Sequence, residues 1–290
     1  MEDIRVTLAT EREAPACLAL LPEAQGVPVE LLIARRRGVF AGAAGLYWRS
    51  WSKPGGFPTQ IHVLPLQRRQ GVGRRLLQEA ALLAAPETEG LWSLRPAKPQ
   101  SPEALFMQAC GFVPRRRQHH FQARIEVLLT HLAPLVARLR AHGRIPPDVQ
   151  VVSLAEAPLE EVGWLVSAEL GGGPIEALHR LRQRDAAPAP DNLDRSLAVL
   201  HEGHVIGAML WRLKDGLATV DARVVAPRWR NGWPNLLLLE ASLLRARDEG
   251  IADFRFYCDE TVRDTLRLAQ RASAVEVASD ALFYYAIAET

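Results

Sequence analysis

The stretch IHVLPLQRRQGVGRRLL, residues 61–77, combines the residue types of an anion-binding site with the start of a helix. Glycine at positions 71 and 73 would let a ligand approach the backbone without meeting a Cβ atom. The first N–H groups of a helix lack intrahelical partners and lie at the positive end of its dipole. Three arginines add full charges around the same turn: Arg68, Arg69 and Arg74. We therefore predict that a phosphate or pyrophosphate group binds at this turn.

Other anion-binding motifs fit this stretch poorly. The dinucleotide fingerprint needs a third glycine where Leu76 stands, and the P-loop needs a Gly-Lys-Ser/Thr sequence that is absent. Binding of nucleic acid through the arginines would predict an affinity that falls steeply with salt. The net charge of the 290 residues is only +2, so no general basic surface follows from composition, and we expect no nucleic-acid partner.

The spacing of this stretch resembles that of the GCN5-related N-acetyltransferase (GNAT) family. The family signature R/Q-x-x-G-x-G/A corresponds here to Arg68 to Gly73, and the V-x-P that precedes it corresponds to Val63 to Pro65. A later helix that ends in G-F corresponds to ALFMQACGF, which ends at Gly111-Phe112. The resemblance covers about residues 4–125 and, more weakly, residues 149–288.

This resemblance implies an acyltransferase that moves acetyl from acetyl-coenzyme A (acetyl-CoA) to an amine, either a small molecule or a protein N-terminus. The strand before the turn would pair with the pantetheine arm, and backbone N–H groups of the turn would hold the pyrophosphate. No metal ion is expected. The cofactor-binding residues that it implies are Ile61, His62, Val63, Arg68, Arg69, Gln70, Gly71, Val72, Gly73 and Arg74.

Acetyl transfer to an amine needs a base, because the attacking amine must be neutral. Family members often place this base on the strand before the pyrophosphate turn. His62 is the only titratable side chain between Phe57 and Leu64, and imidazole ordinarily titrates near neutral pH. We therefore take His62 as the candidate catalytic base, with a histidine packed against the sheet as the structural alternative.

The departing thiolate also needs a proton, and here the sequence departs from the family. The usual acid is a tyrosine four residues before the Gly of G-F, and Met107 occupies that position. Cys110 lies nearby, although a thiol at this place is more often part of the core. Glu30 and Tyr47 are candidates for an acceptor pocket. The missing acid leaves open a second hypothesis, a non-catalytic CoA-binding sensor or interaction protein.

Alternating apolar patterns and turn residues predict the elements that would position this site. The chain contains two copies of one sequence unit, and each copy should form a mixed, mostly antiparallel sheet flanked by helices, an α/β (α+β) class of fold. Ser101 is the expected cap of a short helix. The predicted elements of the first copy are a strand at 3–9, a helix at 12–23, a hairpin from residue 30 that turns at Arg37-Gly38, a strand at 59–65, a helix at 74–85, a strand at 91–97, a helix at 101–112 and a closing strand at 117–125.

An internal repeat at a spacing of 162 residues predicts two tandem domains. The spacing sets Gly45 on Gly207 and Pro65 on Pro227, and it sets the helix LLQEAALL on LLEASLLR and Phe121 on Phe283. The boundary should follow an amphipathic helix that begins near Glu126, at the glycine and prolines of RAHGRIPPD. The predicted domains are residues 1–143, with the intact motif, and residues 144–290.

The second copy lacks the glycines of the anion site. Arg68 maps to Arg230, but Gly71 and Gly73 map to Trp233 and Asn235, with Pro234 between them, and Gly111-Phe112 maps to Ser273-Ala274. Gly232 lies one residue early. We therefore predict that the C-terminal copy is degenerate and has lost coenzyme binding.

Composition favours a soluble cytoplasmic protein. The three cysteines lie far apart without a C-x-x-C pair, which argues against a disulfide framework or a zinc site. No uncharged run approaches the roughly 20 residues of a membrane span, so we expect no membrane partner. The sequence does not indicate an oligomeric state.

Overall fold

The computed structural model describes residues 4–26, 28–47, 55–170, 177–178, 181–182, 193–230 and 232–287, and it divides the chain into two compact units. The first unit contains the described residues up to Arg117 together with those from Asp280 onward. The second unit contains the described residues from Gln118 to Ser279. Each unit is a mixed sheet flanked by helices, which confirms the predicted fold class.

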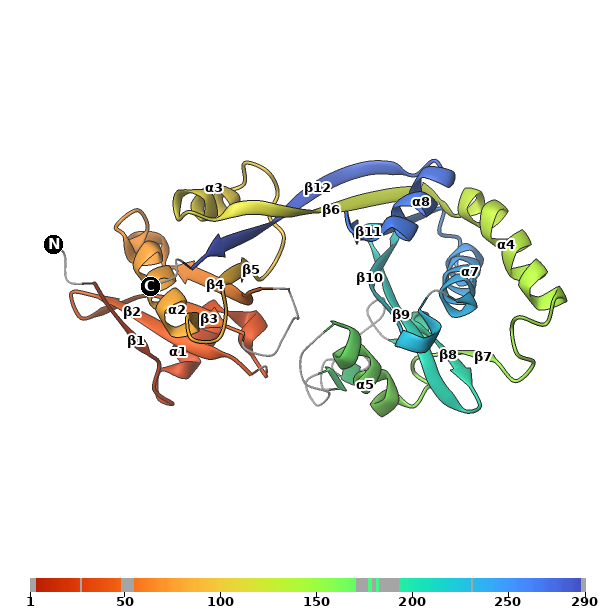
Figure 1. Ribbon diagram of the computed structural model, residues 1–290, viewed down its shortest axis with the longest axis horizontal. Coiled ribbons are helices and arrows are strands. Elements are labelled where there is room, and N and C mark those ends of the chain that lie inside the picture. Colours follow the sequence, from red (N-terminus) through yellow and green to blue (C-terminus); the bar gives the residue numbers. More distant parts are fainter. Residues whose placement is uncertain are drawn as a thin grey trace. The chain divides into compact units, whose positions relative to one another are not determined.

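The sheet of the first unit has the strand order β1-β2-β3-β4-β5-β12 (Figure 1). Neighbouring strands are antiparallel except for β4 and β5, which are parallel. The strands are β1 (Ile4–Leu8), β2 (Glu30–Arg36), β3 (Val39–Leu46), β4 (Phe57–Val63), β5 (Gly90–Ser93) and the part of β12 (Val275–Ala286) from Asp280 onward.

Helices cover both faces of this sheet. The helical segments are α1 (Ala14–Leu20), η1 (Pro22–Ala24), η2 (Pro65–Gln67), α2 (Val72–Ala84) and α3 (Pro102–Ala109). The apolar side of α2 packs with α3 on one face of the sheet, and α1 with η1 packs on the other. The predicted cap of α3 is confirmed, because the Ser101 hydroxyl accepts a hydrogen bond from the Ala104 N–H at 3.2 Å.

The sheet of the second unit has the strand order β6-β11-β10-β9-β8-β7, and only β10 and β11 are parallel (Figure 1). The strands are β6 (Val113–Arg124) from Gln118 onward, β7 (Gln150–Ser153), β8 (Leu197–His201), β9 (His204–Lys214), β10 (Leu217–Val225) and β11 (Asp253–Asp259). The second unit therefore repeats the mostly antiparallel plan of the first.

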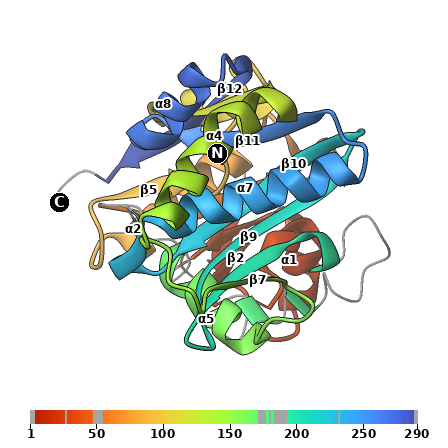
Figure 2. The ribbon, with the colours of Figure 1, turned by 90° about the vertical axis from the view of Figure 1, so that its right-hand side faces the viewer.

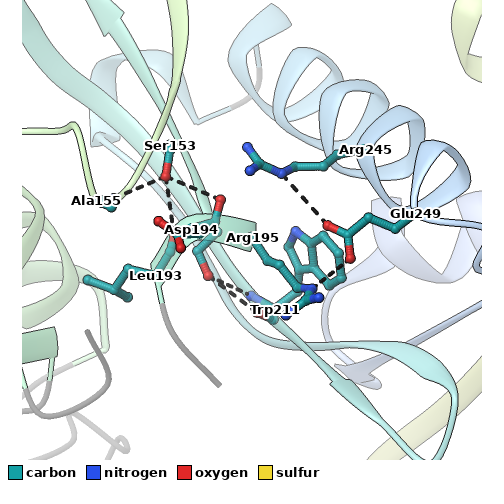
Figure 3. A network of polar contacts seen from close by, with 9 residues as sticks. Ser153, Ala155, Leu193, Asp194, Arg195, Trp211, Arg245 and Glu249 are labelled. Carbon is teal, nitrogen blue, oxygen red and sulfur yellow. Dashed lines mark hydrogen bonds and ion pairs between the residues drawn. The ribbon is translucent and has the colours of Figure 1, made fainter. Parts of the chain in front are cut away.

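The helices of the second unit also lie on both faces of its sheet. They are α4 (Ile125–Ala141), α5 (Leu159–Leu170), η3 (Leu193–Arg195), η4 (Pro227–Trp229), α7 (Trp233–Asp248) and α8 (Arg263–Arg271). The helices α4 and α7 lie side by side over one face, and α5 covers the other (Figure 2). Polar contacts join η3 to the end of α7 and to the last residue of β7: Arg195 pairs with Glu249 at 2.7 Å, and Ser153 donates to the Asp194 carbonyl at 3.2 Å (Figure 3).

The strand that closes each sheet comes from the other half of the chain. We predicted that a strand near residues 117–125 closes the first copy, and this is wrong. In β6, Phe121 lies opposite Phe256 of β11, in the second unit. The first unit is closed by β12, where the Phe283 N–H donates to the Ser93 hydroxyl at 3.0 Å. Repeated strands carry the same apolar alternation, so each fits the sheet of the other copy, as in domain swapping.

This exchange changes how the chain is divided. Residues 118–143 belong to the second unit and residues 280–287 to the first, so the compact units do not coincide with the ranges 1–143 and 144–290. The helix that precedes the predicted boundary is present as α4, which ends at Ala141.

The repeat spacing of 162 residues fails in the first hairpin of each copy. Gly42 pairs with Val63 in the first unit, and Gly207 pairs with Val225 in the second. Gly207 therefore takes the place of Gly42, which lies 165 residues earlier, and not of Gly45. The connection between β9 and β10 is shorter than that between β3 and β4, and this difference accounts for the shift.

Candidate functional site

The parallel strands β4 and β5 run together only over their first residues. Their last register pair is Thr59 with Ser93, and the Leu94 N–H then donates to the Thr59 carbonyl at 2.9 Å. Beyond Thr59, no pairing joins these two strands in the described part of the chain. The edge of β4 on the β5 side is therefore open from Gln60 to Val63. We call this gap the strand opening.

The hydrogen bonds to β3 determine which backbone groups face the strand opening. The Leu64 N–H donates to the Ala41 carbonyl at 3.0 Å, and backbone groups alternate between the two edges of an antiparallel strand. Ile61 and Val63 therefore direct their N–H and C=O groups away from β3. Within the described residues their one hydrogen bond on this edge comes from Arg68 Nε to the Val63 carbonyl, at 3.1 Å. The remaining groups can pair with an extended ligand.

The turn after β4 leads into α2 at Gly71. This residue precedes the first residue of the helix and has φ +83°, in the left-handed region that favours glycine. Among the described residues, a Cβ atom at Gly71 would meet Ile4 Cδ1 alone within 4 Å, in an ordinary van der Waals contact at 3.6 Å. No side chain caps α2, and within the described residues no hydrogen bond uses the backbone N–H groups of residues 69–74. These donors are available for an anion.

The second glycine of the motif has a different role. A Cβ atom on Gly73 would lie 2.6 Å from Phe106 Cε2 and 3.4 Å from Val63 Cγ2. Phe106 belongs to α3, so a glycine at position 73 allows α3 to pack directly on the first turn of α2. We predicted that Gly73 admits the ligand, and the structure shows that it admits the neighbouring helix.

The three arginines of the motif are exposed around the start of α2. Arg68 donates to the last carbonyl of β4, and Arg74 Nη2 donates to the Ala109 carbonyl at the end of α3, at 3.3 Å. Gln70 Nε2 donates to the Leu66 carbonyl at 3.2 Å, which closes the turn on itself. The turn is thus held by its own side chains, and the guanidinium groups place positive charge around its free N–H groups.

A comparison with protein families identifies this segment. Residues 28–114 match the family model described as an acetyltransferase (GNAT) domain. The chain carries a GNAT domain. The matched range includes the strand opening, the turn at Gly71 and both helices α2 and α3.

Solved structures of GNAT proteins share the fold over nearly the whole chain. Eis1 from Mycobacterium abscessus is 16% identical with a TM-score of 0.65, and the match covers 98% of this chain and 74% of that one. A GCN5-related N-acetyltransferase from Anabaena variabilis is 12% identical with a TM-score of 0.64, covering 99% and 73%. A tandem GNAT protein from the clavulanic acid pathway is 15% identical with a TM-score of 0.52, covering 99% and 100%. At these identities the likeness establishes the fold. No curated protein matches the sequence.

The second unit lacks the free helix start that the GNAT domain has at Gly71. Gly232 precedes α7, but its backbone is extended, with φ −109° and ψ −172°. Trp233 is buried at the first helical position, and Pro234 after it has no N–H. Arg230, the counterpart of Arg68, pairs with Glu169 at 2.5 Å. A pyrophosphate would therefore meet a filled surface and a neutralised arginine.

The second unit keeps a strand opening of its own but lines it differently. β10 pairs with β11 only at Ala218 and Thr219. Arg223 stands where Ile61 stands in the GNAT domain, and its Nη2 donates to the Thr265 hydroxyl at 3.2 Å. Burial lowers the pKa of the Arg223 guanidinium. A charged side chain thus takes the register position that the apolar side chain of Ile61 has in the GNAT domain.

His62 lies on the other face of β4 from Ile61 and Val63. Those two side chains pack with α2 and α3, and successive side chains of a strand alternate between its faces. His62 therefore shares a face with Gln60, on the side of α1 and η1. The candidate base is thus beside the strand opening but not among the side chains that pack beneath the pyrophosphate turn.

A polar chain on this same face joins Tyr47, a candidate for the acceptor pocket, to three residues that the sequence did not single out. The Tyr47 hydroxyl donates to Gln60 Oε1 at 3.0 Å, Gln60 Nε2 donates to Glu23 Oε2 at 2.7 Å, and Arg95 Nη2 pairs with Glu23 Oε1 at 3.0 Å. We call these four residues the Glu23 chain. No short motif announces it, because its members come from four elements. The available signals were Tyr47, itself a candidate for the acceptor pocket, and Gln60, a polar residue two positions before His62 in β4.

The remaining candidates are not brought together. Tyr47 is buried on the α1 side of the sheet, whereas Glu30 is exposed and alternates with Leu31, whose side chain packs on that side. Glu30 therefore lies on the opposite face. Met107 packs partly buried against the core under α2. Burial raises the pKa of the Cys110 thiol despite the nearby charge of Arg74, so this thiol is a poor proton donor to a leaving thiolate.

The described residues contain no group of three His, Cys, Asp or Glu side chains arranged to hold a metal ion. None of the described helices combines the length and the hydropathy of a membrane span. The three cysteines are free thiols.

Proposed function

We propose that the protein is an N-acetyltransferase that moves acetyl from acetyl-CoA to an amine, a small molecule or a protein N-terminus, and that the first unit holds the coenzyme. This proposal rests on one observation, which is that two ligand-binding features follow each other directly along the chain. The open edge of β4 leads directly into the uncapped start of α2 at Gly71. One linear ligand with amide groups at one end and phosphates at the other satisfies both.

In this proposal, β4 binds the pantetheine arm of the coenzyme and the turn after it binds the pyrophosphate. Backbone groups of Ile61, His62 and Val63 lie along the strand opening, where Ile61 and Val63 offer donors and acceptors to the pantetheine amides. The N–H groups from Arg69 to Arg74, including those of Gln70, Gly71, Val72 and Gly73, hold the pyrophosphate. Arg68, Arg69 and Arg74 add electrostatic attraction to it.

The thioester supplies an activated acetyl group, and the chain supplies orientation and proton transfer. A neutral amine attacks the thioester carbon, the C–N bond forms, and the C–S bond breaks to release the thiolate. His62 is the proposed acceptor of the amine proton. Met107 cannot donate a proton, and the thiol of Cys110 stays protonated. We therefore assign reprotonation of the thiolate to solvent.

A second function is favoured by one observation, the packing of Met107 where a proton donor is usual. A CoA-binding sensor without catalysis needs the same coenzyme site and no acid. We place either protein in the reducing cytoplasm, because its cysteines are free.

The test joins a binding measurement to an activity measurement. Acetyl-CoA is titrated into the protein by calorimetry, and thiol release is followed on a panel of primary amines. We expect binding with thiol release that depends on the amine. Binding without release on any amine would favour the sensor, and an absence of binding would overturn both.

A substitution at Gly71 tests where the coenzyme lies. Gly71→Trp places in the first unit the side chain that the second unit carries at Trp233, and we expect acetyl-CoA affinity to fall at least tenfold with the fold retained. Gly38→Trp is the matched control. Gly38 has φ +78° with nothing within 4 Å of an added Cβ, so it carries the same backbone strain away from the turn. Unchanged affinity in Gly71→Trp would contradict the placement.

A further inference from the structure

The Glu23 chain lies at the end of the strand opening where β4 and β5 separate. Gln60 lies on β4 immediately after the last residue that pairs with β5, and Arg95 follows the end of β5. Both contact the same carboxylate, Gln60 at 2.7 Å and Arg95 at 3.0 Å. Glu23 therefore stands where the two strands separate, on the face of the sheet opposite α2 and α3.

This position has a chemical meaning if the proposed function holds, on which the inference rests. The coenzyme is linear, and its pyrophosphate would lie at the turn after Val63. Its thioester end would then lie toward the point where β4 and β5 meet, beside Gln60. Glu23 and His62 would be the titratable side chains of η1 and β4 on the face from which an acceptor approaches.

Glu23 is suited to hold a cation but not to take a proton. Partial burial opposes its ionisation, but hydrogen bonds from Gln60 and from the backbone, together with the charge of Arg95, keep the pKa of Glu23 below its usual value. Its carboxylate is therefore ionised at neutral pH. A carboxylate next to the attacking amine would raise the pKa of that amine and hold it in the unreactive ammonium form. The group that suits Glu23 is one that stays positively charged.

Arg95 forms an ion pair with the Glu23 carboxylate, but its side chain is largely exposed to solvent. Its side chain is 72% exposed, whereas that of Glu23 is 24% exposed. A pair with one such exposed partner contributes little to stability, so exchange of Arg95 for another cation costs little. A cationic group of a ligand can therefore replace the Arg95 guanidinium at the Glu23 carboxylate.

We propose that Glu23 binds a second cationic group of the acceptor, so that the acceptors of this enzyme are amines with an additional positive charge, such as diamines. Gln60 is a positioning residue for that carboxylate. One amine of the acceptor reacts in its neutral form while the other remains an ammonium ion on Glu23.

The test compares two amines that differ in one charge. The protein is saturated with CoA and titrated by calorimetry with 1,4-diaminobutane or with butylamine. We expect the diamine to bind about tenfold more tightly, the effect of about 1.4 kcal/mol from one charge-assisted contact. Glu23→Gln should remove this preference without loss of CoA affinity. Glu87→Gln removes an exposed carboxylate after the end of α2 and should keep the preference.

Arg95→Ala provides a test of opposite sign. If Arg95 holds a place for the ligand, its removal should strengthen diamine binding, whereas a purely structural pair would leave the preference unchanged or weaken it. Equal affinity for both amines in the natural protein, or a preference that survives in Glu23→Gln, would overturn the inference.

The outcomes separate this inference from the proposed function. Turnover of both amines with equal KM would retain the acetyltransferase and reject the role of Glu23. A diamine preference that depends on Glu23, without thiol release, would retain the cation site and reject catalysis. Failure of both amines to bind would reject the site.

Discussion

At the scale of single residues, Gly71 and Gly73 look alike in sequence and differ in physical role. Gly71 is required by its positive φ, and a Cβ atom there would make only an ordinary contact with Ile4 among the described residues. Gly73 is required because Phe106 of α3 lies against it. A substitution at Gly71 therefore probes the ligand, whereas one at Gly73 disturbs the packing of two helices. Spacing alone could locate both glycines but could not distinguish these roles.

The role of His62 predicts a loss of activity when its imidazole is removed. If that imidazole accepts the amine proton, His62→Ala should lower kcat/KM by about 100-fold. Steady-state rates of thiol release check this effect. An unchanged rate in His62→Ala would assign the proton to solvent and leave His62 as a packed strand residue.

The backbone part of the site could be predicted from the sequence, but of its polar part only Tyr47 was a candidate. The turn and the strand before it carry a recognisable spacing, because backbone donors, bare glycine and helix start must follow in a fixed order. Glu23 and Gln60 lie 37 positions apart and meet only because η1 packs against β4. No spacing rule can anticipate a contact that depends on how the sheet is covered.

At the scale of elements, the structure differs most from expectation in β6 and β12. The predicted strands and helices are present with small shifts at their ends, and the cap at Ser101 and the turn at Arg37-Gly38 are confirmed. The partner of a strand is harder to predict than the strand, because two repeated strands satisfy the same pattern. In the first unit, β12 also packs beside Gly111-Phe112, because the centre of the Tyr285 ring lies 5.4 Å from that of the Phe112 ring.

A matched pair of substitutions tests the exchange of strands. Phe283 is 2% exposed in the first unit and Phe121 is 9% exposed in the second. Removal of a buried phenylalanine ring costs about 3–5 kcal/mol. Phe283→Ala should therefore destabilise the first unit and weaken acetyl-CoA binding, although it lies far along the chain from the motif. Phe121→Ala should destabilise the second unit and leave the coenzyme bound.

Hydrogen exchange resolves which sheet is affected. Faster exchange in β5 is expected for Phe283→Ala, and faster exchange in β11 for Phe121→Ala. The reverse assignment would show that each copy is closed by its own strand in solution.

At the scale of the whole molecule, two copies of one plan have diverged in chemistry. Both units have an open strand edge, but Arg223 replaces an apolar side chain on that strand in the second unit. The first unit has a free helix start, whereas the second carries Trp233 and Pro234 there. We therefore expect one acetyl-CoA per chain. Calorimetric titration should give a stoichiometry of one, and Gly71→Trp should weaken this single binding event. A stoichiometry of two would show that the second unit binds coenzyme despite its buried tryptophan.

The late position of β12 in the chain has a consequence for biosynthesis. The edge of β5 stays unpaired until residues 280–286 have been synthesised, roughly 190 residues after Ser93. A ribosome needs about 10–40 s to add that many residues. During this interval the nascent chain exposes an unpaired and apolar edge. We expect chaperones that shield such edges to matter more for the yield of this protein than its size alone suggests.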